Sequence, residues 1–401
     1  MDFFFNLAPE LVAKICEYVT SEDILNFRIT SHDNSIARIN YFPTKIYSLE
    51  TNLNISLIVK LDIQSVKEKI TSIPCGLVRL EYLYCGGTSI TSLPTDMVKL
   101  KHLDCSKTPL LKIPVKILER LEYLDCSSCM MFEYFYDSWT FPLLKYLKCS
   151  NTRLRSIGIM TKIVCLICSG CNNLKILPVG MVLLEFLDCS VCKGLLELPS
   201  DMKLVKKVYC GGCNSMTTIS NMDCLEYLDC SECSLLNTIS SGMVNLSNLN
   251  CSGCNGLLEL PQGMTGLDHL NCSGCNDLLE LPRGMTQLDN LNCSLCSNLT
   301  KIPNDMHKLT YMLCQYMNIE FLPTGMKNLL TLTCCYCPNL ASLPPDLVKL
   351  EFLDCTSCLR LTALPCNMTK LVHLYIGECR INIIPDTLTK LEVVYDYNPY
   401  Y

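Results

Sequence analysis

Residues 270–285 read LNCSGCNDLLELPRGM, and the stretch recurs with few changes at 249–264 and at 291–306. A looser copy, marked by an apolar residue, any residue and then Cys, returns every 19 to 23 residues through most of the chain. Self-similarity at such a period predicts a solenoid, in which each repeat is one structural unit. The fourteen marker cysteines are Cys85, Cys105, Cys126, Cys149, Cys168, Cys189, Cys210, Cys230, Cys251, Cys272, Cys293, Cys314, Cys334 and Cys355.

Each marker predicts one short strand. In Leu270-Asn271-Cys272 apolar residues alternate with a polar one, so Leu270 and Cys272 should point inward and Asn271 outward. Ile63 and Ile376 fill the marker position one repeat beyond each end of the series. A thiol that alternates with Ile acts as a small hydrophobe, because free Cys is among the most buried residue types. We therefore expect the marker cysteines in the core.

The pattern around each marker is L-x-x-L-x-C-x-x-(C/T), then one or two residues, then L-x-x-L-P-x-x-M-x-x-L. This pattern resembles the leucine-rich repeat, and its wording is similar to the Cys-bearing repeats of plant-type receptors. The resemblance implies an α/β solenoid with parallel strands on the concave face and short helical or 3₁₀ turns on the convex face. Pro282 should end the second extended segment, and Met285 and Leu288 suit a single helical turn. Each repeat would bury its apolar face against its neighbours.

Two forms of the repeat coexist. Short repeats carry Thr three residues after the marker, at Thr88, Thr108 and Thr152. We expect this side chain to point inward and to bond the loop backbone, weakly where it is a thiol. Longer repeats carry a second Cys there, at Cys129, Cys171, Cys192, Cys213, Cys233, Cys254, Cys275, Cys296, Cys337 and Cys358.

Composition narrows the class of protein. The net charge of -6 among 401 residues argues against nucleic acid or an anionic membrane as the main partner. The chain lacks the basic start and cleavage site of a signal peptide, and no apolar run reaches the length of a membrane span. With 31 cysteines, an odd number at inward positions, we expect reduced thiols in the cytoplasm or nucleus and no secretion.

Residues 1–40 depart from the repeat. Residues 11–19 carry apolar side chains at helical spacing, a second helix is expected from Ser21-Glu22-Asp23 onward, and a third through Ile36, Ala37 and Ile39. The stretch resembles the F-box, with departures at Ala8 and at His32 and with no Trp in the third helix. The matching residues are Leu7, Glu10, Leu11, Ile15, Tyr18, Val19, Asp23, Ile24, Phe27, Arg28, Thr30 and Ser31.

An F-box before leucine-rich repeats implies a substrate-recognition subunit of a Skp–cullin–F-box ubiquitin ligase, with a Skp-type adaptor and a cullin as partners. The near-verbatim repeats are similar to F-box/repeat proteins of large DNA viruses, for which the adaptor and the cytoplasm would be the host's. The alternative is an interaction scaffold whose N-terminal helices only cap the first turn of the solenoid. The residues that the resemblance assigns to adaptor binding are Leu7, Pro9, Leu11, Ile15, Val19, Ile24 and Phe27.

The predicted organisation has four parts: an F-box-like helical domain at 1–40, a linker or degenerate repeat at 41–60, leucine-rich repeats at 61–392 and a C-terminal cap at 393–401. Within the repeats, residues 130–144 are rich in aromatic side chains, including Phe132, Trp139 and Phe141. They form either a binding loop or a locally repacked core.

The C-x-x-C pairs allow three interpretations. Zinc sites need two such pairs, or one pair with His, converging in space, whereas stacked repeats would hold the pairs parallel. A redox pair is usually placed at a helix N-terminus, and these pairs follow strands. The third interpretation, structural thiols, agrees with the inward positions. The histidines lie repeats apart, so the sequence predicts no catalytic residue, no metal, no cofactor and no enzyme.

The outward strand positions are the candidate binding surface. They form two columns, one rich in aromatic residues and one rich in Asp and Asn. An acidic stripe favours a basic protein partner, although Asp and Ser could also serve only to solvate the sheet. The candidate target-binding residues are Tyr82, Tyr84, Asp104, Tyr123, Asp125, Phe186, Asp188, Tyr227, Asp229, Tyr311 and Asp354.

Overall fold

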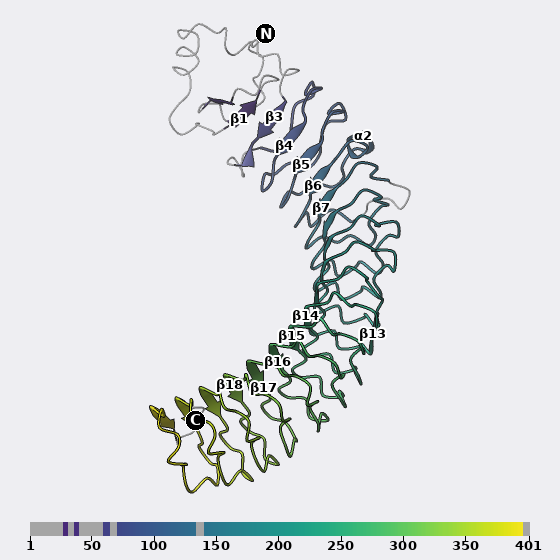
Figure 1. Ribbon diagram of the computed structural model, residues 1–401. Coiled ribbons are helices and arrows are strands. Elements are labelled where there is room, and N and C mark those ends of the chain that lie inside the picture. Colours follow the sequence, from purple (N-terminus) through teal and green to yellow (C-terminus); the bar gives the residue numbers. More distant parts are fainter. Residues whose placement is uncertain (1–26, 31–35, 40–58, 65–69, 134–139, 396–401) are drawn as a thin grey trace. The chain divides into compact units, whose positions relative to one another are not determined.

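The computed structural model describes residues 27–30, 36–39, 59–64, 70–133 and 140–395 (Figure 1). The chain forms two compact units, residues 1–184 and 185–401. Both are built from the same turn: one short strand, a loop, an extended return segment and a tight turn back to the next strand.

The described part of unit 1 contains six parallel strands in repeat register, and each is three residues long. Leu61 pairs with Leu83, Leu83 with Leu103 and Leu103 with Leu124, so equivalent positions of neighbouring repeats lie side by side. One helical turn, α2 (Val115–Leu118), lies on the return side and buries Ile117 and Leu118. The strands are β3 (Lys60–Asp62), β4 (Tyr82–Tyr84), β5 (His102–Asp104), β6 (Tyr123–Asp125), β7 (Tyr146–Lys148) and β8 (Cys165–Ile167).

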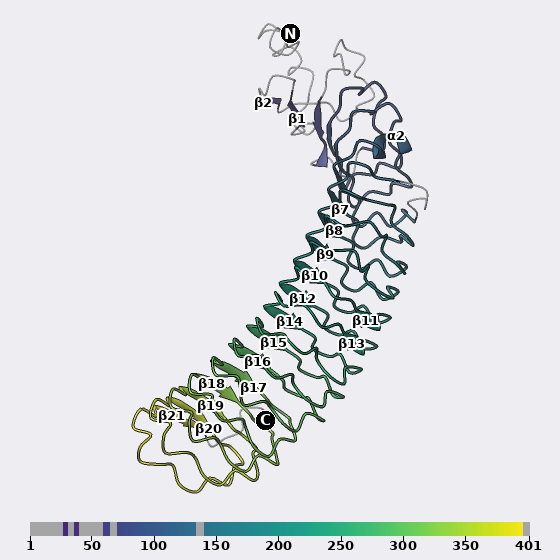
Figure 2. The same ribbon diagram turned by 45° about the vertical axis from the view of Figure 1, so that its right-hand side comes forward.

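Unit 2 continues the same pattern. Two-residue strands β11 (Thr218–Ile219) and β13 (Thr238–Ile239) pair on the return side, opposite β12 and β14 (Figure 2). Strand β21 (Val393–Tyr395) pairs with β20 (His373–Tyr375), so the parallel ladder extends into the predicted cap at 393–401. The main strands are β9 (Phe186–Asp188), β10 (Lys207–Tyr209), β12 (Tyr227–Asp229), β14 (Asn248–Asn250), β15 (His269–Asn271), β16 (Asn290–Asn292), β17 (Tyr311–Leu313), β18 (Thr331–Thr333), β19 (Phe352–Asp354), β20 (His373–Tyr375) and β21 (Val393–Tyr395).

The inward and outward positions are as predicted. Leu270 and Cys272 are buried and Asn271 is half-buried, and every marker cysteine is at most 1% exposed. Ile63 and Ile376 are buried in the same position. Free thiols therefore fill the space between neighbouring strands and return segments, where small apolar side chains allow close stacking of turns.

Most return turns are tighter than a helix. Leu288 N–H donates to the carbonyl of Met285 across 3.2 Å, a single three-residue hydrogen bond that does not continue. Among the described residues only Val115–Leu118 is an α-helix. The prediction of short helical or 3₁₀ turns is thus correct for the spacing, but most of these turns are shorter than predicted.

The third N-terminal helix was wrongly predicted. Ile36–Ile39 is strand β2, which pairs antiparallel with β1 (Phe27–Thr30), and Thr30 of β1 lies opposite Lys60 of β3. Residues 27–30, Phe-Arg-Ile-Thr, alternate apolar and polar side chains, as a strand with one buried face does. Ile29 and Thr30 are also β-branched, and such residues favour strands over helices. Phe27 therefore lies in a strand. The other predicted adaptor residues (Leu7, Pro9, Leu11, Ile15, Val19 and Ile24) and the first predicted helix lie outside the described residues.

The aromatic segment at 130–144 contributes to the core. Phe132 and Phe141 are 1% and 0% exposed and replace the aliphatic residues of other repeats. Trp139 and the other residues of 134–139 lie outside the described residues, so the binding-loop interpretation stays a prediction for them.

The second cysteines link neighbouring turns. Nine of the ten second-cysteine thiols donate a hydrogen bond to the carbonyl of the marker cysteine in the preceding turn, across 3.0 to 3.2 Å. Cys379, three residues after Ile376, donates in the same way to the Cys355 carbonyl at 2.8 Å. Threonine acts differently: the Thr88 hydroxyl donates to the carbonyl of Cys85 in its own turn. The thiols that form this ladder are those of Cys129, Cys171, Cys213, Cys233, Cys254, Cys275, Cys296, Cys337, Cys358 and Cys379.

The strand face as a candidate interaction surface

The two predicted columns exist in each unit, on the side that we call the strand face: the outward first and third residues of each main strand. In unit 1, Tyr82 pairs in register with His102, and His102 with Tyr123. The third positions align Tyr84 with Asp104 and Asp104 with Asp125. The sequence pattern therefore placed these six side chains correctly.

The aromatic residues on the strand face of unit 1 form one continuous cluster. His102 stacks on Tyr123 with parallel rings 4.0 Å apart, and it lies 4.9 Å from the ring of Tyr84. Lys60 and Lys148 place their ammonium groups over Tyr84 and Tyr123, at 5.0 and 5.8 Å from the ring centres. Such contacts between rings and cations stabilise the cluster and hold its shape before any partner arrives.

Partial burial shifts the pKa values of the tyrosines and the histidine in this cluster. Desolvation raises the pKa of Tyr84 and of Tyr123 above the ordinary value, and nearby aspartates add to the effect. Desolvation also lowers the pKa of His102, because burial disfavours the imidazolium form. The surface that unit 1 offers at neutral pH therefore combines neutral rings with the carboxylates of Asp104 and Asp125.

The predicted aspartates have a structural task as well. Asp104 Oδ1 accepts hydrogen bonds from Ser106 N–H and from its hydroxyl, at 3.0 and 2.8 Å. The same contact closes the loop after the strand at Asp125, Asp188 and Asp229. Each of these side chains therefore stabilises the loop that follows its strand, whether or not a partner is bound.

Asp354 is the extreme case among the predicted residues. Its side chain accepts a hydrogen bond from Thr356 N–H, and it is only 6% exposed. Of the predicted aspartates it therefore has the least surface to offer. Its neighbour Phe352 on the same strand is half-buried and contacts Tyr375, with ring centres 5.5 Å apart.

In unit 2 the predicted aromatic residues lie at two places. Phe186 contacts Tyr209, and Tyr209 contacts Tyr227, with ring centres 5.7 and 4.9 Å apart. Tyr311 lies further along the first column, 39% exposed. Between Tyr227 and Tyr311 the strand face forms a shallow hollow of about 350 Å³.

Side-chain amides line this hollow together with leucines, and the predicted site did not include these amides. Asn250, Asn271 and Asn292 each accept a hydrogen bond at Oδ1 from the backbone two residues later. We call the hollow the amide hollow. It is lined by Tyr227, Asn248, Leu249, Asn250, His269, Leu270, Asn271, Asn290, Leu291, Asn292, Tyr311 and Leu313. The signal was present in the sequence, because Asn replaces Asp before the marker in three successive repeats.

The buried thiols differ in how readily they ionise. Burial raises the pKa of Cys335 and of Cys337 to about 12, so they remain protonated at neutral pH. Cys129 and Cys171 differ, because hydrogen bonds from Cys105 and Cys149, with help from Thr108 and Thr152, lower each pKa to about 7. Within the described part of the chain, no three His, Cys, Asp or Glu residues converge as metal ligands. No helix of the described residues is long and apolar enough to cross a bilayer.

Comparison with known proteins identifies the fold. No protein-family model and no curated protein sequence matches the chain. Among solved structures, the leucine-rich effector YopM from Yersinia pestis superposes with a TM-score of 0.51 at 20% identity, covering 84% of this chain and 88% of that one. YopM from Yersinia enterocolitica gives a TM-score of 0.49 at 20% identity (81% and 75%). The functional domain of InlJ from Listeria monocytogenes, which includes a cysteine ladder, gives 0.43 at 19% identity (80% and 74%). The repeat, the parallel ladder and the Y. pestis likeness together establish that this chain folds as a leucine-rich-repeat solenoid.

Proposed function

We propose that this chain is a protein-recognition scaffold that holds a partner protein on its strand face. The observation that carries the proposal is the amide hollow, bounded by Tyr227 and Tyr311. Solenoids commonly use the extended surface formed by their strands to bind other proteins. The hollow offers such a surface, and its lining contains no acidic residue.

The chemistry of the hollow suits a polypeptide. Side-chain amides both donate and accept hydrogen bonds, as the backbone of a bound segment requires. Tyr residues supply contact area at low entropic cost and are enriched at binding hot spots. The aromatic cluster around Tyr123 in unit 1 is a second surface of the same kind. The proposal assigns binding, and no catalysis, to the chain.

Site-specific photo-crosslinking tests this proposal. A benzoylphenylalanine at position 271, in the amide hollow, is compared with one at position 244, where Val244 is 60% exposed outside the strand face. We expect a protein adduct from position 271 that a Tyr227→Ala/Tyr311→Ala variant loses, and no adduct from position 244. Equal labelling at both positions, or no adduct at 271, would contradict the proposal.

A finer proposal concerns the N-terminus. The ordered match of Leu7, Glu10, Leu11 and Ile15 to the F-box pattern supports a substrate-recognition subunit that docks a Skp-type adaptor and, through it, a cullin. In this role residues 1–40 would connect the chain to the ligase, and the strand face would hold the target. The reducing environment that the many free thiols need is consistent with a cytoplasmic or nuclear location.

A pull-down with a eukaryotic Skp-type adaptor separates the two roles. Wild type is compared with Leu11→Asp/Ile15→Asp, and circular dichroism checks that the repeats stay folded in the variant. Capture by wild type alone would support the ligase role. If folded wild type captures no adaptor, the finer proposal is wrong and the general scaffold proposal stands.

A further inference from the structure

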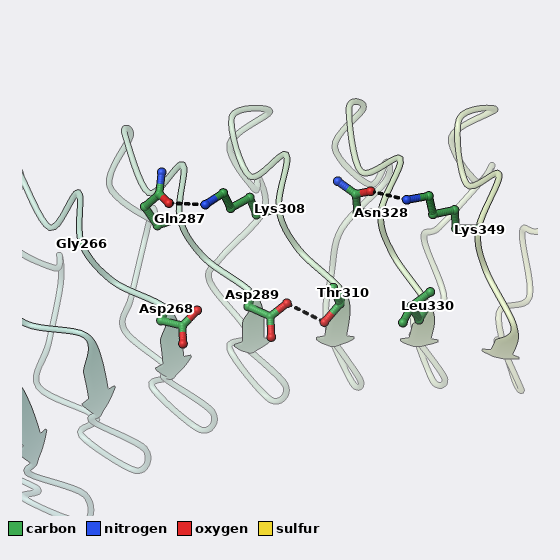
Figure 3. Close-up of a pocket in the computed structure, with 9 residues that line it drawn as sticks. All are labelled: Gly266, Asp268, Gln287, Asp289, Lys308, Thr310, Asn328, Leu330 and Lys349. Atoms are coloured by element: carbon green, nitrogen blue, oxygen red, sulfur yellow. Dashed lines mark hydrogen bonds between the residues drawn. The ribbon is translucent and has the colours of Figure 1, made fainter.

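A second hollow, of about 610 Å³, lies beside the strand face of unit 2 (Figure 3). It follows the residues that immediately precede β15, β16, β17 and β18, which we call the leading edge. Its lining forms two rows: Asp268, Asp289, Thr310 and Leu330 on the strand side, and Gln287, Lys308, Asn328 and Lys349 on the outer side. We call it the leading-edge groove.

Three acidic residues that immediately precede a main strand are paired with a lysine of the next turn. Lys101 forms an ion pair with Glu81 of the preceding turn at 2.9 Å, and Lys145 does so with Glu122 at 2.8 Å. In unit 2, Lys206 pairs with Glu185 at 3.0 Å. At each of these places a lysine one turn later covers the acidic residue.

The groove holds two acidic residues without such a lysine on adjacent turns, whereas Glu226, Glu351 and Glu392, which also lack one among the described residues, stand singly in the column. Asp268 and Asp289 occupy the same column on neighbouring turns, about 4.8 Å apart along the ladder, and no lysine or arginine of the described residues pairs with either. Asp268 contacts His269 Nδ1 at 3.0 Å, while Asp289 accepts from the Thr310 hydroxyl at 2.6 Å and from Asn290 at 2.8 Å. Two adjacent carboxylates thus share one side of the groove.

The lysines of the groove are turned to neutral partners. Lys308 donates to the side-chain carbonyl of Gln287, and Lys349 to that of Asn328 at 2.8 Å. Figure 3 shows these pairs on the outer row, apart from the two aspartates. Gly266 begins the outer row without a side chain, so Asp268 stays accessible from that end. The carboxylates and the lysine ammonium groups therefore lie on opposite rows of the groove.

We propose that the leading-edge groove binds an extended segment of the partner protein that carries a basic residue and, further along, an acidic one. The basic side chain lies against Asp268 and Asp289, the acidic one against Lys308 or Lys349, and Leu330 supplies an apolar contact. Turns are spaced by about 4.8 Å and an extended chain advances by about 3.3 Å per residue, so two to five residues separate the two charges. This inference rests on the proposed protein-binding function and names the kind of segment bound.

Peptide display provides the test. Random 12-residue peptides are selected on the full chain, and the affinity of the enriched synthetic peptides is measured by fluorescence anisotropy. The groove variant is Asp268→Asn/Asp289→Asn, which keeps the side-chain shape and removes the charge. The matched control is Glu185→Gln, because that carboxylate already has a partner in Lys206.

We expect enrichment of peptides with Arg or Lys two to five residues from Asp or Glu. Their affinity should fall at least tenfold in the groove variant, remain unchanged in the control and fall also in Lys308→Glu/Lys349→Glu. The inference is overturned if no such peptide is enriched, or if the enriched peptides bind the groove variant as they bind wild type. If binding is lost only in Tyr227→Ala/Tyr311→Ala, the groove assignment fails while the strand-face proposal survives. If, in addition, the crosslinker at position 271 gives no adduct, both the groove inference and the strand-face proposal are wrong.

Discussion

The thiol of Cys275 donates a hydrogen bond to the backbone carbonyl of Cys251, one turn earlier, across 3.1 Å. Both residues are fully buried, so the contact connects two turns inside the core. Because the same bond recurs at the second cysteine of other long repeats, the thiols contribute to stacking in addition to filling space. The Cys251 carbonyl also accepts from the Cys254 N–H at 3.3 Å, so the thiol is a second, weaker donor to the same buried acceptor.

Removing one ladder thiol should therefore destabilise the solenoid. We expect Cys275→Ala to lower the free energy of unfolding by about 1–2 kcal/mol, from the lost hydrogen bond and the small cavity left behind. Urea unfolding followed by circular dichroism measures the change. The control is Cys366→Ala at an exposed thiol, which should change the stability by less than about 0.5 kcal/mol. Equal effects of the two substitutions would show that the ladder contributes nothing.

Alkaline pH should unfold the protein through its buried thiols. Burial raises the pKa of Cys335 and of Cys337 to about 12 in the folded state, from an ordinary value of 9.0. Unfolded thiols ionise at lower pH than folded ones, so this stability is fully present below pH 9 and is lost as the pH rises from 9 toward 12. In that window each such thiol lowers the free energy of unfolding by about 1.4 kcal/mol for each pH unit of increase. Urea midpoints at pH 7.5, 9 and 10.5 should fall steeply above 9, and a flat profile would contradict the account.

Left-handed backbone at one loop position predicts a stabilising substitution. Val191 has φ of 58°, where Gly170 and Gly212 of neighbouring repeats have 73°, and its side chain is 47% exposed. A β-branched residue is strained in this region by about 1–2 kcal/mol, which exceeds the entropic cost of glycine. We expect Val191→Gly to raise the urea midpoint. Val244→Gly, at an exposed position without positive φ, should lower it. A loss of stability in both would exclude strain at Val191.

The stacked pair of His102 and Tyr123 predicts a titration. Desolvation lowers the pKa of His102 below the ordinary 6.5, so its NMR titration midpoint should lie below that value. Tyr123→Ala removes the ring 4.0 Å away, admits water and should move the midpoint upward toward 6.5. An unchanged midpoint would show that the neighbouring ring does not set the pKa.

Much of the fold followed from periodicity. The alternation in Leu270-Asn271-Cys272 predicted burial and exposure residue by residue, because neighbouring turns are copies and present the same environment. The strands at 27–30 and 36–39 were mistaken for helices, since short apolar runs fit both periods. Their pairing with each other and with Lys60 decided the outcome.

The sequence predicted the two columns of the candidate site, but it did not predict the hollow or the groove that the structure forms beside them. Sequence reasoning found Tyr227 and Tyr311, but not the amide hollow between them, because a hollow depends on side-chain size across several turns. It did not find the groove at Asp268 and Asp289, since the residues that line it come from five successive turns. Nor did it foresee that Asp354 is buried and accepts a hydrogen bond from Thr356 N–H.

The sequence by itself determined the repeating turn, the inward thiols and the composition of each outward column. These properties are local, because a strand period of two and a repeat of about 21 residues assign every side chain a direction. Tertiary structure alone decided which thiol reaches which carbonyl and which acidic residues find a lysine. It also decided where neighbouring side chains leave room for a partner. Those outcomes depend on contacts between residues about 20 positions apart, and only the stacking of turns brings such residues within a hydrogen bond of one another.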